Sequence, residues 1–160
     1  MHVLYLLLGG NLGDKKAIFS RAIIRLTEEL GELIDCSSIF ETEPWGFEAD
    51  EFFWNQVLVI QTDKDPQEVL VATKAIEIEL GRERGVERYA SRTIDIDLLF
   101  YDDRVLDEEN LQLPHPRMID RNFVLKPMVE IAPDFVHPVF NKSLAQLLSE
   151  CDDTLEARAI

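Results

Sequence analysis

The chain has 160 residues, of which 31 are acidic and 16 are basic, so its formal net charge at pH 7 is −15. This acidity argues against a general nucleic-acid or anionic-membrane binder, because both partners attract basic surfaces. The length suits a single domain, 1–160. Cys36 and Cys151 fit no metal-ligand spacing, and no stretch approaches the roughly 18 apolar residues of a membrane span, which predicts a cytoplasmic protein with reduced thiols.

The first part of the chain predicts a strand, a helix and two further strands. An apolar strand at about 3–8 ends at two glycines. Asp14 then stands at an N-cap position before apolar residues at helical spacing, and Gly31 closes this helix in the C′ position. Residues 33–42 and 52–62 have the composition of strands, and a loop rich in turn formers separates them.

The next part predicts a second helix and a fourth strand. Pro66 opens the helix, Gly81 ends it, and an arginine-rich loop leads into a strand that runs to about Tyr101. This order indicates an α+β, ferredoxin-like βαββαβ core, in which two helices cover one face of an antiparallel sheet and the other face is free for a ligand. Beyond the core, residues 102–113 predict an extra C-terminal hairpin, and 122–133 and 143–150 predict short helices.

The segment RTIDIDLL, residues 92–99, carries two aspartates two positions apart. Residues i and i+2 of a strand point to the same face, so Asp95 and Asp97 are expected side by side, opposite the apolar residues around them. Guanidinium groups bind phosphate oxygens, and carboxylates hold Mg²⁺ together with phosphates. A D-x-D pair alone is more often a solvated strand face, but here an arginine cluster precedes it, which favours a polyphosphate site with Mg²⁺. The cluster comprises Arg82, Arg84, Arg88 and Arg92.

Five separate blocks of the sequence stand in an order that matches a known family. They are GGNLGD, FETEPWGF, FFWNQV, RYASRTIDIDLL and LPHPRMIDRNFVL. Together they resemble the 6-hydroxymethyl-7,8-dihydropterin pyrophosphokinase family of folate biosynthesis, from the first strand to about Pro133. The most specific element, R-x-small-x-R-x-x-D-x-D followed by aliphatic residues, begins at Arg88. The resemblance implies that the β,γ-diphosphate of ATP moves to the hydroxymethyl oxygen of the pterin and that AMP is released.

The resemblance also implies roles for single residues. Asp95 and Asp97 would bind two Mg²⁺ ions that bridge the triphosphate, and Arg82 and Arg92 would assist the transfer. A flat, polar pterin needs aromatic faces and an amide edge, here supplied by two phenylalanines, an asparagine and the backbone of residues 42–45. The residues that match ATP positions are Arg84, Arg88, Arg92, Leu98, His115 and Arg121. Those that match pterin positions are Thr42, Pro44, Trp45, Phe53, Asn55 and Phe123. No residue is assigned as a general base.

Two other functions fit parts of this pattern. A nucleotidyltransferase on a ferredoxin-like sheet also uses paired carboxylates, and it would release pyrophosphate in place of AMP. A ferredoxin-like module that binds a regulatory ligand without catalysis would not need carboxylates beside arginines. The sequence therefore favours a monomeric enzyme that acts on two small molecules, ATP and hydroxymethyldihydropterin, and that has no nucleic-acid or membrane partner.

Overall fold

The computed structural model describes residues 1–43, 52–84 and 94–160, with the backbone alone for 82–84. The elements of the core are β1 (His2–Gly10), α1 (Lys15–Leu30), β2 (Gly31–Cys36), β3 (Phe40–Thr42), β4 (Phe53–Thr62), α2 (Pro66–Arg84) and β5 (Asp95–Tyr101). The remaining elements are β6 (Leu106–Glu108), β7 (Leu111–Leu113), a 3₁₀ turn (Met118–Asp120), α3 (Asn122–Ile131), α4 (Leu144–Glu150) and β8 (Ala157–Ala159).

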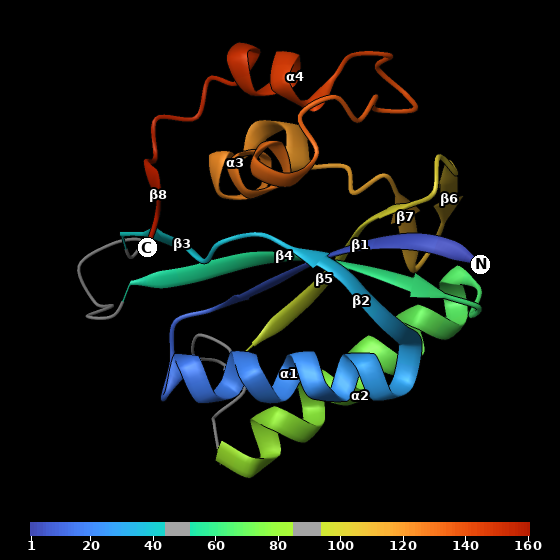
Figure 1. Ribbon diagram of the computed structural model, residues 1–160, viewed down its shortest axis with the longest axis vertical. Coiled ribbons are helices and arrows are strands. Elements are labelled where there is room, and N and C mark those ends of the chain that lie inside the picture. Colours follow the sequence, from blue (N-terminus) through green and yellow to red (C-terminus); the bar gives the residue numbers. More distant parts are fainter. Residues whose placement is uncertain (44–51, 85–93) are drawn as a thin grey trace.

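The described strands form one antiparallel sheet and a separate hairpin (Figure 1). Within the described residues the sheet has six strands, in the order β5-β1-β4-β3-β8, and β2 also pairs with β4. The order β5, β1, β4 and then β2 and β3 is that of the predicted ferredoxin-like core, which is thereby confirmed. The strand expected over 33–42 is divided into β2 and β3. Between them the hydroxyl of Ser37, in place of a backbone carbonyl, accepts the Val57 N–H at 2.9 Å.

The first helix begins and ends where the sequence predicts. The Asp14 carboxylate accepts a hydrogen bond from the Ala17 N–H at 3.2 Å, which caps the helix. Gly31 follows Leu30 with φ of 147° and is already the first residue of β2. A Cβ atom at this position would lie 2.0 Å from the carbonyl oxygen of Gln61, so the direct passage from helix to strand requires glycine.

The prediction that Gly81 ends the second helix is wrong, because α2 continues to Arg84. Gly81 does not have a positive φ, and nothing lies within 4 Å of the position that its Cβ would occupy. Glycine lowers the stability of a helix but does not force it to end. The buried residues Ile76 and Leu80 hold the preceding turns of α2 against the sheet.

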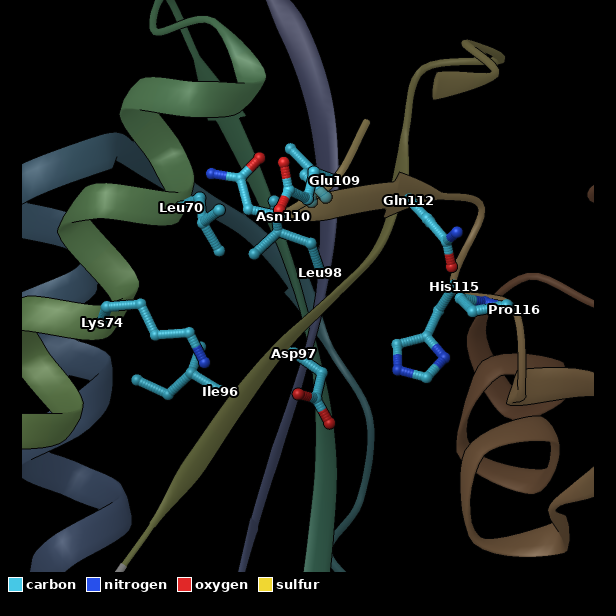
Figure 2. Close-up of a pocket in the computed structure, with 11 residues that line it drawn as sticks. Leu70, Lys74, Ile96, Asp97, Leu98, Glu109, Asn110, Gln112, His115 and Pro116 are labelled. Atoms are coloured by element: carbon cyan, nitrogen blue, oxygen red, sulfur yellow. The ribbon is translucent and has the colours of Figure 1, made fainter. Parts of the chain in front are cut away.

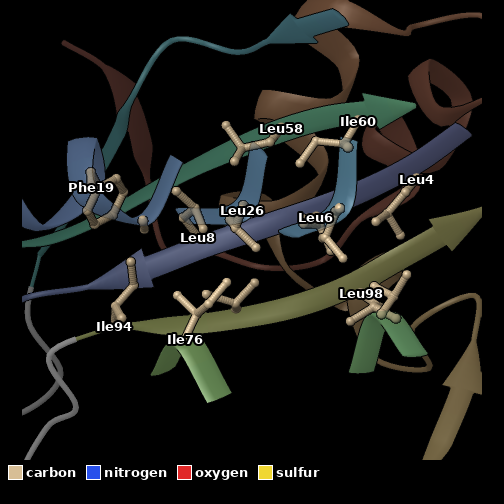
Figure 3. Packing of buried hydrophobic residues seen from close by; sticks show 14 of the residues in the cluster. Leu4, Leu6, Leu8, Phe19, Leu26, Leu58, Ile60, Ile76, Ile94 and Leu98 are labelled. Atoms are coloured by element: carbon tan, nitrogen blue, oxygen red, sulfur yellow. The ribbon is translucent and has the colours of Figure 1, made fainter. Parts of the chain in front are cut away.

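Two apolar clusters lie on opposite faces of the sheet. The larger one fills the space between the sheet and α1 and α2, with Leu6, Leu26 and Ile76 among its members (Figure 3). The second joins Leu7 and Val57 of the sheet to α3 and α4. The second face is therefore not free along its whole length, because the predicted short helices α3 and α4 cover part of it (Figure 1).

The hairpin β6–β7 and the helices α3 and α4 confirm the elements predicted after the core. The strand β8, which pairs with β3, was not predicted. None of the helices in the described part of the chain is long and apolar enough to cross a membrane.

Candidate active site

The two aspartates of β5 lie on the face of the sheet away from α1 and α2. Ile96 and Leu98 are almost fully buried in the larger cluster, whereas Asp95 and Asp97 are partly exposed. Strand alternation therefore gives the arrangement that the sequence predicts, with both carboxylates on one face. The face that carries them is the one that α3 and α4 cover in part.

A row of cross-strand partners connects the carboxylates to the predicted pterin residues. Gly9 of β1 pairs with Asp95 on one side and with Asn55 of β4 on the other. Paired residues share a face, and neighbouring strands are about 4.8 Å apart, which places Asp95 and Asn55 roughly 10 Å from each other. A Cβ atom on Gly9 would lie 2.8 Å from the Oδ1 atom of Asn55, so the amide of Asn55 lies across Gly9.

Three of the predicted pterin residues meet at the ends of β3 and β4. Thr42 is 3% exposed and pairs with Phe53, which is partly exposed and begins β4. Asn55 is 6% exposed and follows Phe53 on the same face of the strand. Phe123 lies in the first turn of α3, packs against the second cluster, and has the Arg121 guanidinium carbon 5.5 Å from its ring centroid.

A pocket of about 280 Å³ at the edge of the sheet is lined by Asp97, one of the two carboxylates. Figure 2 shows the side chains of Lys74, Asp97 and His115 directed toward one space between α2, β5 and the residues after the β6–β7 hairpin. Leu98 also lines this pocket. Sequence reasoning missed several other lining residues, namely Leu70, Lys74, Glu109, Asn110 and Gln112. The spacing of four positions between Leu70 and Lys74 could have indicated one shared face of α2.

His115 is held by its backbone and by one ring nitrogen. Its N–H donates to the Leu99 carbonyl at 3.0 Å, and its Nδ1 atom accepts from the Arg117 N–H at 3.2 Å. Burial lowers the pKa of His115, Arg121 and Arg117 lower it further, and Asp97 partly opposes them. The ring is therefore neutral at pH 7, and because Nδ1 accepts, Nε2 carries the proton and can donate.

A largely buried carboxylate that the sequence did not single out fixes β5 beside the pocket. Glu77 of α2 accepts the Ile96 N–H at 2.6 Å, and its other oxygen lies 3.5 Å from the Lys74 ammonium. Burial raises the pKa of Glu77, although the bond from Ile96 opposes this rise. Because Ile96 stands between Asp95 and Asp97, Glu77 holds the strand at the point where both carboxylates originate.

The donor set fits Mg²⁺ that is shared with a substrate. Asp97 lines the pocket and Asp95 lies two residues away on the same face of β5, and Mg²⁺ commonly binds one or two such carboxylates together with phosphates and water. Among the side chains that the structure describes, no group of three or more His, Cys, Asp or Glu residues could hold a metal ion by itself. The remaining ligands would therefore come from phosphate and water.

Several predicted site residues cannot be compared with this geometry. Pro44, Trp45, Arg88 and Arg92 lie outside the described residues. Arg82 and Arg84 are placed through their backbone in the last turn of α2.

The sheet order defines the chain as a ferredoxin-like α+β domain, and a pocket lies at the edge strand β5 of its sheet. Solved structures share this fold. The chain superimposes on wild-type Plasmodium falciparum HPPK-DHPS with SDX-DHP with a TM-score of 0.72 and 19% identity, over 94% of this chain and 43% of that one. A second HPPK-DHPS structure, in complex with substrates, gives a TM-score of 0.71 at 16% identity, over 93% of this chain and 43% of that one. The chain thus spans less than half the length of these structural neighbours.

Sequence comparison identifies the family. Residues 5–133 match the family model of 7,8-dihydro-6-hydroxymethylpterin-pyrophosphokinase (HPPK), and the chain belongs to this family of enzymes. The Porphyromonas gingivalis 2-amino-4-hydroxy-6-hydroxymethyldihydropteridine pyrophosphokinase is 43% identical over 144 residues, which are 86% of this chain and 95% of that protein. The Aquifex aeolicus protein of the same name is 39% identical over 150 residues, which are 94% of this chain and 92% of that protein. These matches confirm the resemblance found in the sequence.

Proposed function

We propose that the protein transfers the β,γ-diphosphate of ATP to the hydroxymethyl group of 6-hydroxymethyl-7,8-dihydropterin and releases AMP, as a step of folate biosynthesis. Membership of the pyrophosphokinase family supports this reaction. The structural observation that carries the proposal is the row Asp95, Gly9 and Asn55, which sets a carboxylate and a buried amide on one sheet face. That row supports adjoining positions for the two substrates.

In this proposal ATP occupies the pocket beside β5. Asp95 and Asp97 would hold two Mg²⁺ ions, which would neutralise charge on the triphosphate. The apolar side of Leu98 contacts the nucleotide, and the Nε2–H of His115 donates to it. The phosphate oxygens are held by guanidinium groups, which bind them in paired hydrogen bonds. These groups belong to Arg82, Arg84, Arg88, Arg92 and Arg121.

The pterin lies at the other end of the row. The rings of Phe53 and Phe123 stack on it, and Asn55 and Thr42 bind its polar edge, together with residues of the segment that contains Pro44 and Trp45. The hydroxymethyl oxygen attacks the β phosphorus, the bond from that phosphorus to the oxygen of AMP breaks, and the hydroxyl proton passes to water. A loose transition state needs little base assistance, so we assign no general base.

This reaction differs from that of the alternatives in what it releases. A nucleotidyltransferase would release pyrophosphate, and a regulatory module would release nothing. We further propose that the chain acts as a single-domain monomer in the cytoplasm, with ATP and the pterin as its partners.

The test is an assay of nucleotide products with MgATP, with and without hydroxymethyldihydropterin. AMP is expected when the pterin is present. Asp97→Asn should lower turnover by more than the roughly 100-fold that loss of an outer-shell metal partner can cost. Asp103→Asn, at an exposed position just beyond β5, is the matched control and should leave turnover unchanged. Pterin-independent AMP, or pyrophosphate as the product, would contradict the proposal.

A further inference from the structure

The C-terminal segment 152–160 lies outside the part of the chain that matches the family model, yet it contacts two elements of the proposed pterin site. It leaves α4, passes the N-terminus of α3 and ends as β8 beside β3 (Figure 1). Ala157 of β8 pairs with Thr42, a predicted pterin residue. The segment therefore joins α3, which carries Phe123, to the strand that carries Thr42.

Asp153 caps α3 from outside the helix. The N-cap residue of α3, Arg121, makes no capping bond with its own side chain. Instead, the Oδ2 atom of Asp153 accepts the N–H of Asn122 at 2.9 Å. Its Oδ1 atom accepts the Leu155 N–H at 3.0 Å, which fixes the carboxylate in place. A negative charge at a helix N-terminus is favourable, because the first backbone N–H groups lack partners within the helix.

Side chains of α3 hold the segment in return. The amide of Asn122 donates to the carbonyl oxygens of Asp153 and Leu155, at 2.9 and 3.1 Å. One turn later, the ammonium of Lys126 donates to the Ala157 carbonyl at 3.1 Å. These bonds connect the first two turns of α3 to the residue that pairs with Thr42.

Phe123 opens onto the same space as Asp153. A pocket of about 540 Å³ is lined by Phe123 and Arg121 from the start of α3 and by Asp153 and Leu155 from the C-terminal segment, together with Arg117 and Asp120. The residue that caps the helix thus lines the same pocket as the ring that is expected to stack on the pterin.

We propose that Asp153 is a positioning residue for the pterin: it fixes the first turn of α3, and with it the ring of Phe123, relative to Thr42. The inference rests on the proposed function. Its physical basis is that an uncapped first turn frays, and a ring on a frayed turn must be ordered again when the ligand binds.

The test compares Asp153→Ala with Ser143→Ala. Ser143 caps α4 through a similar bond, in which its Oγ atom accepts the Gln146 N–H at 3.1 Å, and it touches neither substrate position. The dissociation constant of 6-hydroxymethyl-7,8-dihydropterin is measured by calorimetry with Mg²⁺ and a nonhydrolysable ATP analogue at saturation, and the melting temperature of each variant is recorded.

We expect Asp153→Ala to weaken pterin binding by roughly fivefold, the factor that corresponds to loss of one helix cap. The melting temperature of Ser143→Ala should fall by as much as that of Asp153→Ala, while its pterin affinity should stay unchanged. Asp153→Asn, which retains an oxygen acceptor, should recover the affinity to within about twofold. Lys126→Met, which loses one anchor of the segment, should give a smaller loss of affinity than Asp153→Ala.

Unchanged pterin affinity in Asp153→Ala and Lys126→Met would overturn this inference, as would an equal loss in Ser143→Ala, which would indicate a general loss of stability. Either result leaves the proposed function intact. Failure of the unsubstituted protein to bind the pterin or to form AMP would overturn the proposed function itself, and this inference with it.

Discussion

Replacement of Glu77 tests how β5 is fixed beside the proposed metal site. The side chain of Glu77 is 10% exposed, and it accepts the N–H of Ile96, which is 1% exposed, at 2.6 Å. Glu77→Met keeps a side chain of similar length but removes the acceptor. Glu77→Gln keeps an acceptor oxygen and removes the charge, so this pair of variants separates the hydrogen bond from the carboxylate.

The expected magnitude follows from the burial of the donor. A buried N–H without a partner costs about 1–3 kcal/mol, so Glu77→Met should lose this much free energy of unfolding. At about 2–4 °C per kcal/mol for a chain of this size, its melting temperature should fall by roughly 2–12 °C. Because burial raises the pKa of Glu77 and thus disfavours its charged form, Glu77→Gln should remain within about 1 kcal/mol of the unsubstituted protein.

Urea denaturation followed by fluorescence measures both variants, and the Mg²⁺ dependence of turnover provides a functional readout. Ile96 lies between Asp95 and Asp97, so loss of its partner should move half-maximal activity to a higher Mg²⁺ concentration in Glu77→Met and leave it unchanged in Glu77→Gln. Equal stability of the two variants would refute the reasoning, because it would mean that the Ile96 N–H does not depend on Glu77.

Three further substitutions test the surroundings of single residues. Gly9→Ala would place a Cβ atom 2.8 Å from the Oδ1 atom of Asn55 and so displace this side chain. It should raise the KM for the pterin roughly tenfold, since a displacement of about 1 Å in a binding site can cost up to 100-fold in rate. An unchanged KM would argue against a pterin contact of Asn55. Gly81→Ala meets no atom within 4 Å near the end of α2, and it should add up to about 1 kcal/mol to the free energy of unfolding in urea. A less stable variant would show that this glycine has another role. Burial lowers the pKa of His137 below its ordinary 6.5, so its contribution to stability is complete above pH 6.5 and is lost as the pH falls toward the lowered value. His137→Asn should therefore reduce the slope of unfolding free energy against pH just below pH 6.5, and equal slopes would contradict the assignment.

Local patterns were sufficient for most elements of this fold. The period of two in RTIDIDLL placed Asp95 and Asp97 on one face, and the helical spacing after Asp14 gave α1 with its cap, because both patterns depend on neighbours within a turn or a pleat. The end of α2 was misjudged at Gly81, since a glycine only permits a helix to stop. The short strand β8 has no periodicity long enough to detect, and it exists because β3 offers it an edge.

The sequence by itself determined the order of the core strands and helices and the family, and it predicts residues for phosphate and metal chemistry, because each of these depends on short segments of the chain. Only the tertiary structure decided which residues of those segments contact one another. The register that sets Gly9 between Asp95 and Asn55, the bond from Ile96 to Glu77 and the cap that Asp153 places on α3 each join positions distant along the chain. These contacts arise from strand pairing and from the need of buried backbone groups for hydrogen-bond partners. Neither can be predicted from a local sequence pattern.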